Sequence, residues 1–102
     1  MIEPPYDAAI ELTLPARWVP RNRLEHISRL IETVERNHGP GGFAEFGVAM
    51  GTSASIIAWH ARRLGRHLSL FDTFAGLPPS TEADGPRAKE FEGKCRGEYN
   101  KA

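Results

Sequence analysis

The apolar residues of this chain follow two different periods, which predict helices and strands in alternation. Two stretches, 23–37 and 53–64, carry apolar residues at spacings of three and four, as one face of a helix does. Two short runs, 43–48 and 67–71, have the length and composition of buried parallel strands. The helical positions are Leu24, Ile27, Leu30, Ile31 and Val34 in the first stretch, and Ala54, Ile57, Ala58, Ala61 and Leu64 in the second. This order predicts an α/β fold that contains one β-α-β unit of a parallel sheet.

Polar residues and glycines mark the ends of the predicted helices. Asn22 is a good N-cap, and Glu25 stands three residues later, where a capping box places an acidic residue. The first helix should stop at the glycine- and proline-rich stretch 38–42, and the second at Gly65.

The N-terminal residues 1–21 are predicted to form an arm. Their four prolines leave no room for a helix of useful length. The arm nevertheless holds several apolar residues, so we expect it to pack either on its own domain or on a second subunit of a homo-oligomer. Residues 22–80 then form the N-terminal part of a ligand-binding domain. Residues 81–102 are rich in charge and are predicted to form a mobile tail or lid loop, partly helical near 88–93.

Composition excludes several classes of partner. The 102 residues carry 13 basic and 13 acidic side chains, so no net charge favours nucleic acid or an anionic membrane surface. No apolar run is long enough to cross a membrane. Cys95 is the single cysteine, and the N-terminus has no secretory signal, so a reducing cytoplasm is the expected compartment.

The junction at 43–55, which reads FAEFGVAMGTSAS, is the candidate ligand site. Gly47 and Gly51 suit a tight turn between strand and helix, where a nucleotide-like ligand can meet backbone N–H groups. Asp72 ends the second strand 21 positions after Gly51, close to the interval that places a carboxylate on a ribose. Ala49 stands where a dinucleotide site has its second glycine, which disfavours NAD. A purely structural turn remains the alternative.

These two segments resemble the macrocin O-methyltransferase family, class I enzymes that use S-adenosylmethionine to methylate sugar hydroxyls on macrolides and related metabolites. The resemblance lies in EFGVAMGTSA and in LFDTFAGLPPSTEAD, and the second motif is the more specific. It implies an incomplete Rossmann-like class I methyltransferase fold, with a small-molecule hydroxyl, such as that of a sugar, as acceptor. The implied cofactor-binding residues are Glu45, Gly47, Val48, Gly51, Thr52, Ser53, Asp72, Thr73 and Phe74. Within that set, the turn holds the amino acid end, Asp72 the ribose, and Thr73 and Phe74 the adenosine.

The chain departs from the family pattern at several positions and in length. Phe46 replaces a cysteine, Ala49 and Met50 replace a Trp-Arg pair, Thr52 replaces a glycine, and Ala75 replaces a glutamate. In the family, magnesium ligands and the catalytic base come from later strands. We therefore assign no catalytic or metal-binding residue here and expect a fragment that is inactive alone. The alternative is a truncated, non-catalytic remnant that acts as an interaction module.

Overall fold

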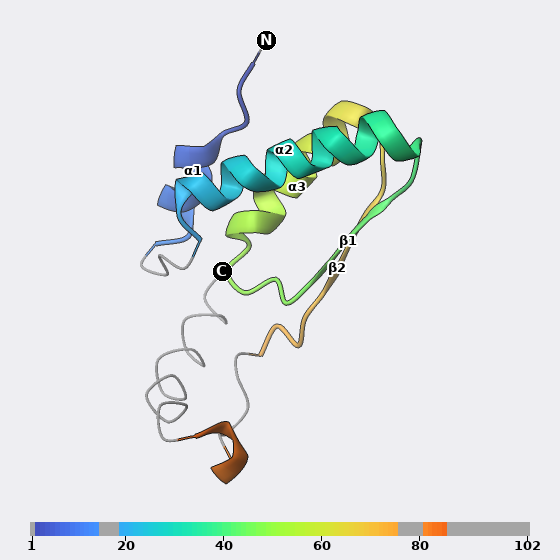
Figure 1. Cartoon of the computed structure of the whole chain (residues 1–102). Coiled ribbons are helices and arrows are strands. Elements are labelled where there is room, and N and C mark those ends of the chain that lie inside the picture. Colours follow the sequence, from blue (N-terminus) through green and yellow to red (C-terminus); the bar gives the residue numbers. More distant parts are fainter. Residues whose placement is uncertain (1, 15–18, 76–80, 86–102) are drawn as a thin grey trace. The chain divides into compact units, whose positions relative to one another are not determined.

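The computed structural model describes residues 2–14, 19–75 and 81–85, and the chain divides into two compact units, Met1–Asp72 and Thr73–Ala102. The first unit is a small α/β structure of three helices and a two-stranded parallel sheet (Figure 1). Its elements are α1 (Tyr6–Leu12), α2 (Arg21–His38), β1 (Phe43–Phe46), α3 (Thr52–Leu64) and β2 (Leu68–Phe71).

The N-terminal segment contains a helix of seven residues, although its prolines were predicted to leave no room for a helix of useful length. Helix α1 begins directly after Pro5, and the N–H of Ala9 donates to the Pro5 carbonyl at 3.0 Å. Proline is tolerated at a helix start, where its missing N–H has no partner to lose, and the next proline, Pro15, comes only after α1 has ended. Tyr6 and Ala9 are buried in a cluster with Leu24 and Ile56, so this segment packs on its own chain.

Helix α2 begins earlier than its capping pattern predicts. Pro20, in an extended conformation, is the N-cap, and its carbonyl accepts the N–H groups of Arg23 and Leu24. The predicted pairing of Asn22 with Glu25 does not form. Glu25 instead accepts a hydrogen bond from Arg21, one helical turn earlier, at 3.4 Å. The helix ends before Gly39, in the stretch that the sequence predicts.

The sheet is parallel, as predicted. Its strand residues are half-buried or exposed, whereas the sequence predicts buried strands. Residues 43–46 pair with residues 68–71 in register, from Phe43 opposite Leu68 to Phe46 opposite Phe71. Phe46 is 77% exposed and stacks on Phe71, with ring centroids 4.8 Å apart. In the described part of the chain only one face of this sheet is covered by helices (Figure 1).

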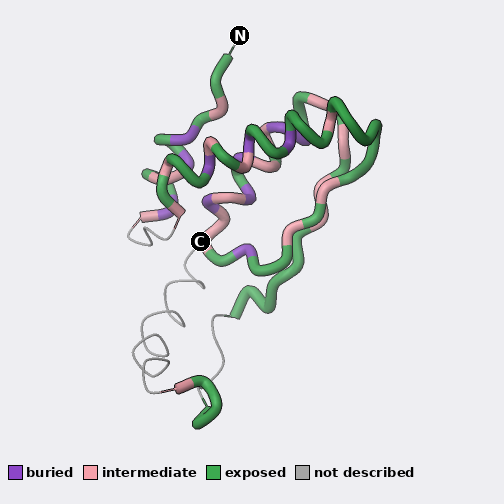
Figure 2. The backbone as a smooth tube through the Cα atoms, in the orientation of Figure 1, coloured by how far each residue is buried: buried purple, intermediate pink, exposed green. Residues whose placement is uncertain are grey.

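Helix α3 joins the two strands and completes the β-α-β unit. It ends at Gly65 in the left-handed conformation, as predicted. Its buried face differs from the prediction, because α3 packs on α1 and α2 as well as on the sheet. The buried residues are Thr52, Ala54, Ile56, His60 and Ala61, whereas Ala58 is exposed and Ile57 and Leu64 are half-buried. Figure 2 shows the buried positions gathered where the three helices meet.

The described part of the second unit is short. Residues Glu82–Asp84 form one 3-10 turn (η1), and the Thr81 N–H donates to the Asp84 carboxylate at 2.7 Å. The predicted partial helix near 88–93 and Cys95 lie outside the described residues.

Candidate functional site

The carboxyl ends of β1 and β2 lie side by side and form the base of the site. The Gly47 N–H donates to the Phe71 carbonyl at 2.8 Å, which extends the ladder by one bond beyond the strands. Asp72 follows directly, so the glycine turn after β1 and the carboxylate after β2 meet at one edge, as the topology of parallel strands requires.

Asp72 organises the turn itself. Its Oδ2 accepts the N–H of Val48 at 2.7 Å and the N–H of Ala49 at 3.1 Å. Gly47, Ala49 and Gly51 all have positive φ, of 82°, 54° and 91°. Ala49 therefore takes a conformation that L residues rarely adopt, and two charge-assisted hydrogen bonds to Asp72 offset part of its cost. The sequence pattern predicts the position of Asp72 but not this role.

Glu45 brings a partly buried carboxylate to the start of α3. Its Oε2 accepts the Ser53 hydroxyl at 2.7 Å, whereas its Oε1 is buried and has no hydrogen-bond partner among the described residues. Burial raises the pKa of Glu45 above its usual value, and the hydrogen bond from Ser53 opposes that shift. An unsatisfied buried oxygen of this kind is unusual in a folded protein and is suited to an incoming donor.

The first turn of α3 offers backbone donors. Gly51 is the N-cap and has no side chain to occupy them, and the first N–H groups of a helix have no intrahelical partner. The Thr52 side chain does not face this site: it is buried, and its Oγ1 lies 2.6 Å from that of Thr13. Thr52 thus brings backbone, rather than its hydroxyl, to the turn.

The predicted set is divided between the two units. Glu45, Gly47, Val48, Gly51, Thr52, Ser53 and Asp72 belong to the first unit, and Thr73 and Phe74 belong to the second. Within the second unit, the Ala75 N–H donates to Thr73 Oγ1 at 3.3 Å, and Phe74 has a positive φ of 56°.

Comparison with protein families gives a match to macrocin O-methyltransferase (TylF) over residues 13–99. The chain belongs to this family. Searches of curated proteins and of solved structures found no match. The family match covers both strand ends and the turn between them, and it identifies the chain, by resemblance, as a methyltransferase.

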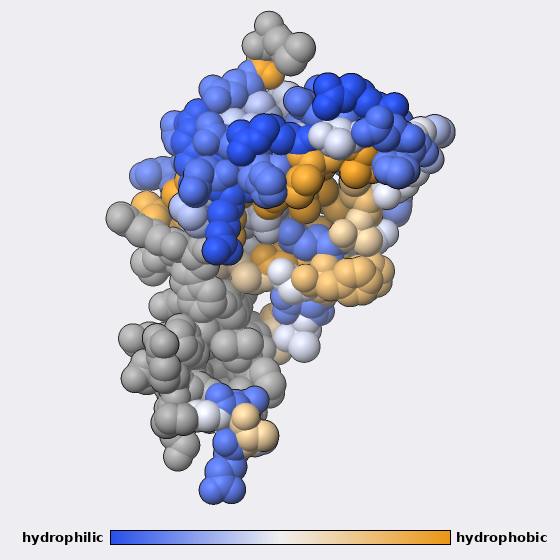
Figure 3. All heavy atoms as spheres, viewed as in Figure 1, coloured by the Kyte–Doolittle hydropathy of each residue, from blue (hydrophilic) through white to orange (hydrophobic). Residues whose placement is uncertain are grey.

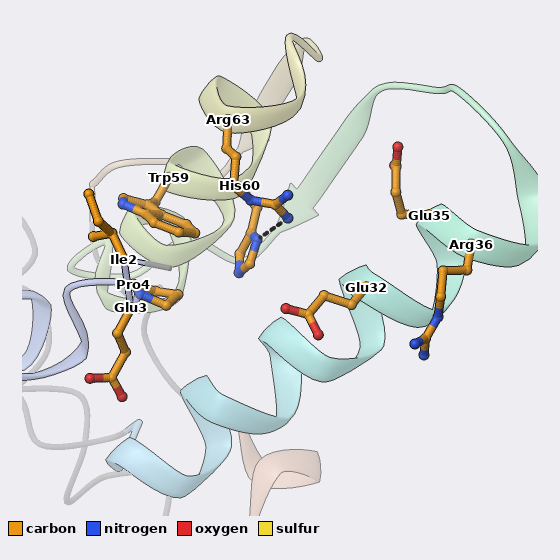
Figure 4. A pocket seen from close by; sticks show the side chains of 9 residues that line it. All are labelled: Ile2, Glu3, Pro4, Glu32, Glu35, Arg36, Trp59, His60 and Arg63. Atoms are coloured by element: carbon orange, nitrogen blue, oxygen red, sulfur yellow. Dashed lines mark hydrogen bonds between the residues drawn. The ribbon is translucent and has the colours of Figure 1, made fainter.

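A separate pocket, which includes no residue of the glycine turn, lies between the N-terminal residues, α2 and α3 (Figure 4). It has a volume of about 550 Å³. Its lining residues are Ile2, Glu3, Pro4, Glu32, Glu35, Arg36, Trp59, His60 and Arg63. These side chains carry charges of both signs beside one indole ring, so they select no single class of ligand.

His60 in this pocket is a polar core residue that the sequence analysis missed. It is 1% exposed; Ser28 Oγ lies 2.8 Å from Nε2 and Arg63 Nη2 lies 2.9 Å from Nδ1. Because arginine can only donate, Nδ1 accepts and Nε2 carries the proton that is donated to Ser28. Burial, and secondarily the charge of Arg63, lowers the pKa of His60, while Glu32 opposes the shift. The spacing of four from Ile56 is the sequence signal that could have found it.

Apolar side chains also line a groove of about 220 Å³ between α2, α3 and β1. Leu30 and Val34 of α2 lie in it and are about half exposed, at 51% and 48%. Figure 3 shows this apolar patch below the charged outer surface of α2.

Two further properties concern the described residues alone. None of their His, Cys, Asp and Glu side chains form a group of three that could hold a metal ion. None of the helices within those ranges has the length and apolar character needed to cross a membrane.

Proposed function

We propose that this chain supplies part of the S-adenosylmethionine site of a Rossmann-like class I O-methyltransferase. The observation that carries the proposal is Glu45, whose buried Oε1 has no partner among the described residues. A buried carboxylate oxygen is best satisfied by a cationic donor. The α-ammonium group of S-adenosylmethionine is such a donor, and the residues present therefore fit the cofactor at this point.

The remaining groups of the turn suit the other parts of the same ligand. The backbone N–H groups at the start of α3 suit the methionine carboxylate, because a helix N-terminus attracts anions. A carboxylate at the position of Asp72 can accept both hydroxyl hydrogens of a ribose. Since Asp72 Oδ2 also holds the Val48 and Ala49 N–H groups, cofactor and turn would share this side chain. Thr73 and Phe74 are proposed to line the adenosine.

The reaction proposed for the whole enzyme is transfer of the sulfonium methyl group to a hydroxyl of a small metabolite, such as a sugar. The cofactor supplies the electrophilic methyl group, and this chain's residues bind and orient it. We assign the base that takes the hydroxyl proton to no residue of this chain. Magnesium, which the family resemblance implies, is likewise tied to none of the described residues.

Calorimetric titration with S-adenosylhomocysteine tests the proposal. We expect saturable binding by the chain, weakened roughly ten- to hundredfold in Glu45→Gln and in Asp72→Ala, because each change removes a charged hydrogen-bonding group. Glu32→Gln, an exposed carboxylate on α2, is the matched control and should bind as the original chain does. Absence of saturable heat, or equal affinities for all four proteins, would refute the cofactor site.

A non-catalytic interaction module is the second candidate, and the exposed apolar side chains favour it. The stacked Phe46 and Phe71 and the groove beside Leu30 and Val34 are surfaces that a partner could cover. This candidate predicts a cooperatively melting chain that binds no S-adenosylhomocysteine. The same titration, combined with a thermal melt, therefore separates the two.

A further inference from the structure

A buried pair of threonine hydroxyls links the N-terminal segment to the start of α3. Thr13 Oγ1 and Thr52 Oγ1 lie 2.6 Å apart, although the residues are 39 positions apart in sequence. Both residues are buried, at 6% and 7% exposure. Thr52 is the first residue of α3, directly after the glycine turn.

Only one direction of the bond between the two hydroxyls lets both of them donate. Thr13 Oγ1 lies 2.9 Å from the Ala9 carbonyl and 3.2 Å from the Ile10 carbonyl, and since a carbonyl can only accept, the Thr13 hydroxyl donates to these carbonyls. The Thr52 hydroxyl then donates to Thr13 Oγ1. Because neither hydroxyl is open to water, loss of one partner leaves the other unsatisfied in the interior.

Two consecutive residues therefore hold the first turn of α3 from different elements. Thr52 is bound to the end of the α1 segment, and Ser53 donates to Glu45 of β1 at 2.7 Å. The Gly51 N–H donates to the Val48 carbonyl at 3.0 Å, which ties the glycine turn to the same helix start. A shift of α3 at Thr52 would thus move both Ser53, which donates to Glu45, and the glycine turn.

We propose that Thr13 is a positioning residue for the glycine turn and the start of α3, and that it acts through Thr52. This inference rests on the proposed S-adenosylmethionine site. The N-terminal segment then does more than cover the core: its hydroxyl sets where the backbone donors of α3 stand relative to Glu45 and Asp72. Thr13 touches no ligand in this account, so its effect must appear as a change in the turn.

The test compares Thr13→Val, which keeps the volume and removes the hydroxyl, with Thr13→Ser, which keeps the hydroxyl. Hydrogen exchange of the Gly51 and Ser55 amides, which donate to the carbonyls of Val48 and Gly51, should accelerate in Thr13→Val without ligand and stay protected in Thr13→Ser. Affinity for S-adenosylhomocysteine should fall roughly two- to thirtyfold in Thr13→Val, the range for residues that act without touching a ligand. Tyr6→Leu loosens the opposite end of α1 and serves as the control for a general loss of stability.

The proposal is overturned if Thr13→Val changes exchange and affinity no more than Tyr6→Leu does at the same loss of melting temperature. It is also overturned if Thr13→Ser fails to retain the protection. Should the original chain bind no S-adenosylhomocysteine, the proposed function fails, while the exchange data still decide whether Thr13 positions the turn. If Thr13→Val does not fold, Thr13→Cys, of similar volume and weaker hydrogen bonding, makes the same comparison.

Discussion

Acidification should destabilise the fold through His60. His60 is almost fully buried, and its Nδ1 accepts a hydrogen bond from Arg63. Protonation would place an N–H of His60 against an N–H of Arg63 and put a second positive charge beside the first. The folded state therefore resists the proton that the unfolded chain takes up readily.

The sign of the effect follows from the depressed pKa of His60 in the folded state. The unfolded chain binds this proton below about pH 6.5, and the folded chain binds it only at lower pH. The contribution of His60 to stability is thus complete above pH 6.5 and is lost as pH falls below that value. The loss can reach about 1.4 kcal/mol per pH unit inside this window. For a domain of this size, a loss of about 1.4 kcal/mol is a large share of the free energy of unfolding.

Urea denaturation between pH 5.5 and 7.5 measures this slope. We expect the free energy of unfolding to decrease as the pH is lowered in the original chain and in His26→Gln, which replaces an exposed histidine on α2. The slope should disappear in His60→Gln and shrink in Arg63→Gln, which keeps His60 but removes the opposing charge. A slope in His60→Gln equal to that of the original chain would refute the reasoning.

Three further outcomes are expected. Arg66→Gln should destabilise the chain by about 1 kcal/mol, because Arg66 pairs with Glu35 at 2.6 Å in a partly buried contact, and urea midpoints would detect it. Ala49→Gly should leave stability unchanged or raise it, since Ala49 has a positive φ, whereas Ala58→Gly on the exposed face of α3 should cost about 1 kcal/mol. Affinity for S-adenosylhomocysteine should rise with pH through the raised pKa of Glu45, above about pH 4.5, because the carboxylate form attracts the ammonium group.

Each outcome has a result that would contradict it. An Arg66→Gln midpoint equal to that of the original chain would show that the ion pair adds nothing measurable. Equal losses in Ala49→Gly and Ala58→Gly would mean that the turn carries no strain at Ala49. A pH dependence of binding that survives in Glu45→Gln would assign the titration to another group.

The sequence alone determined the elements whose residues act locally. Apolar residues at a spacing of three and four place two helices, and short apolar runs place two strands, because the period of the apolar residues distinguishes a helix from a strand. The glycine turn, Asp72 and Gly65 could also be placed, since glycine conformation and strand topology depend on neighbours close in the chain. The family resemblance rests on the same local segments, and the match over residues 13–99 confirms it.

Only the tertiary structure decided which polar side chains are paired and buried. The Thr13–Thr52 bond spans 39 positions and the His60–Ser28 bond spans 32, and no local pattern marks either pair. The sequence predicts the wrong buried face for α3 for the same reason, because α1 and α2 pack on this helix in addition to the sheet. The start of α2 also depends on the tertiary structure. Pro20, and not Asn22, is the N-cap, and Arg21, the first residue of α2, forms ion pairs with Glu3 and Asp7 of the N-terminal segment. Burial and long-range hydrogen bonds depend on what the fold brings near a residue, and its sequence neighbours carry little of that information.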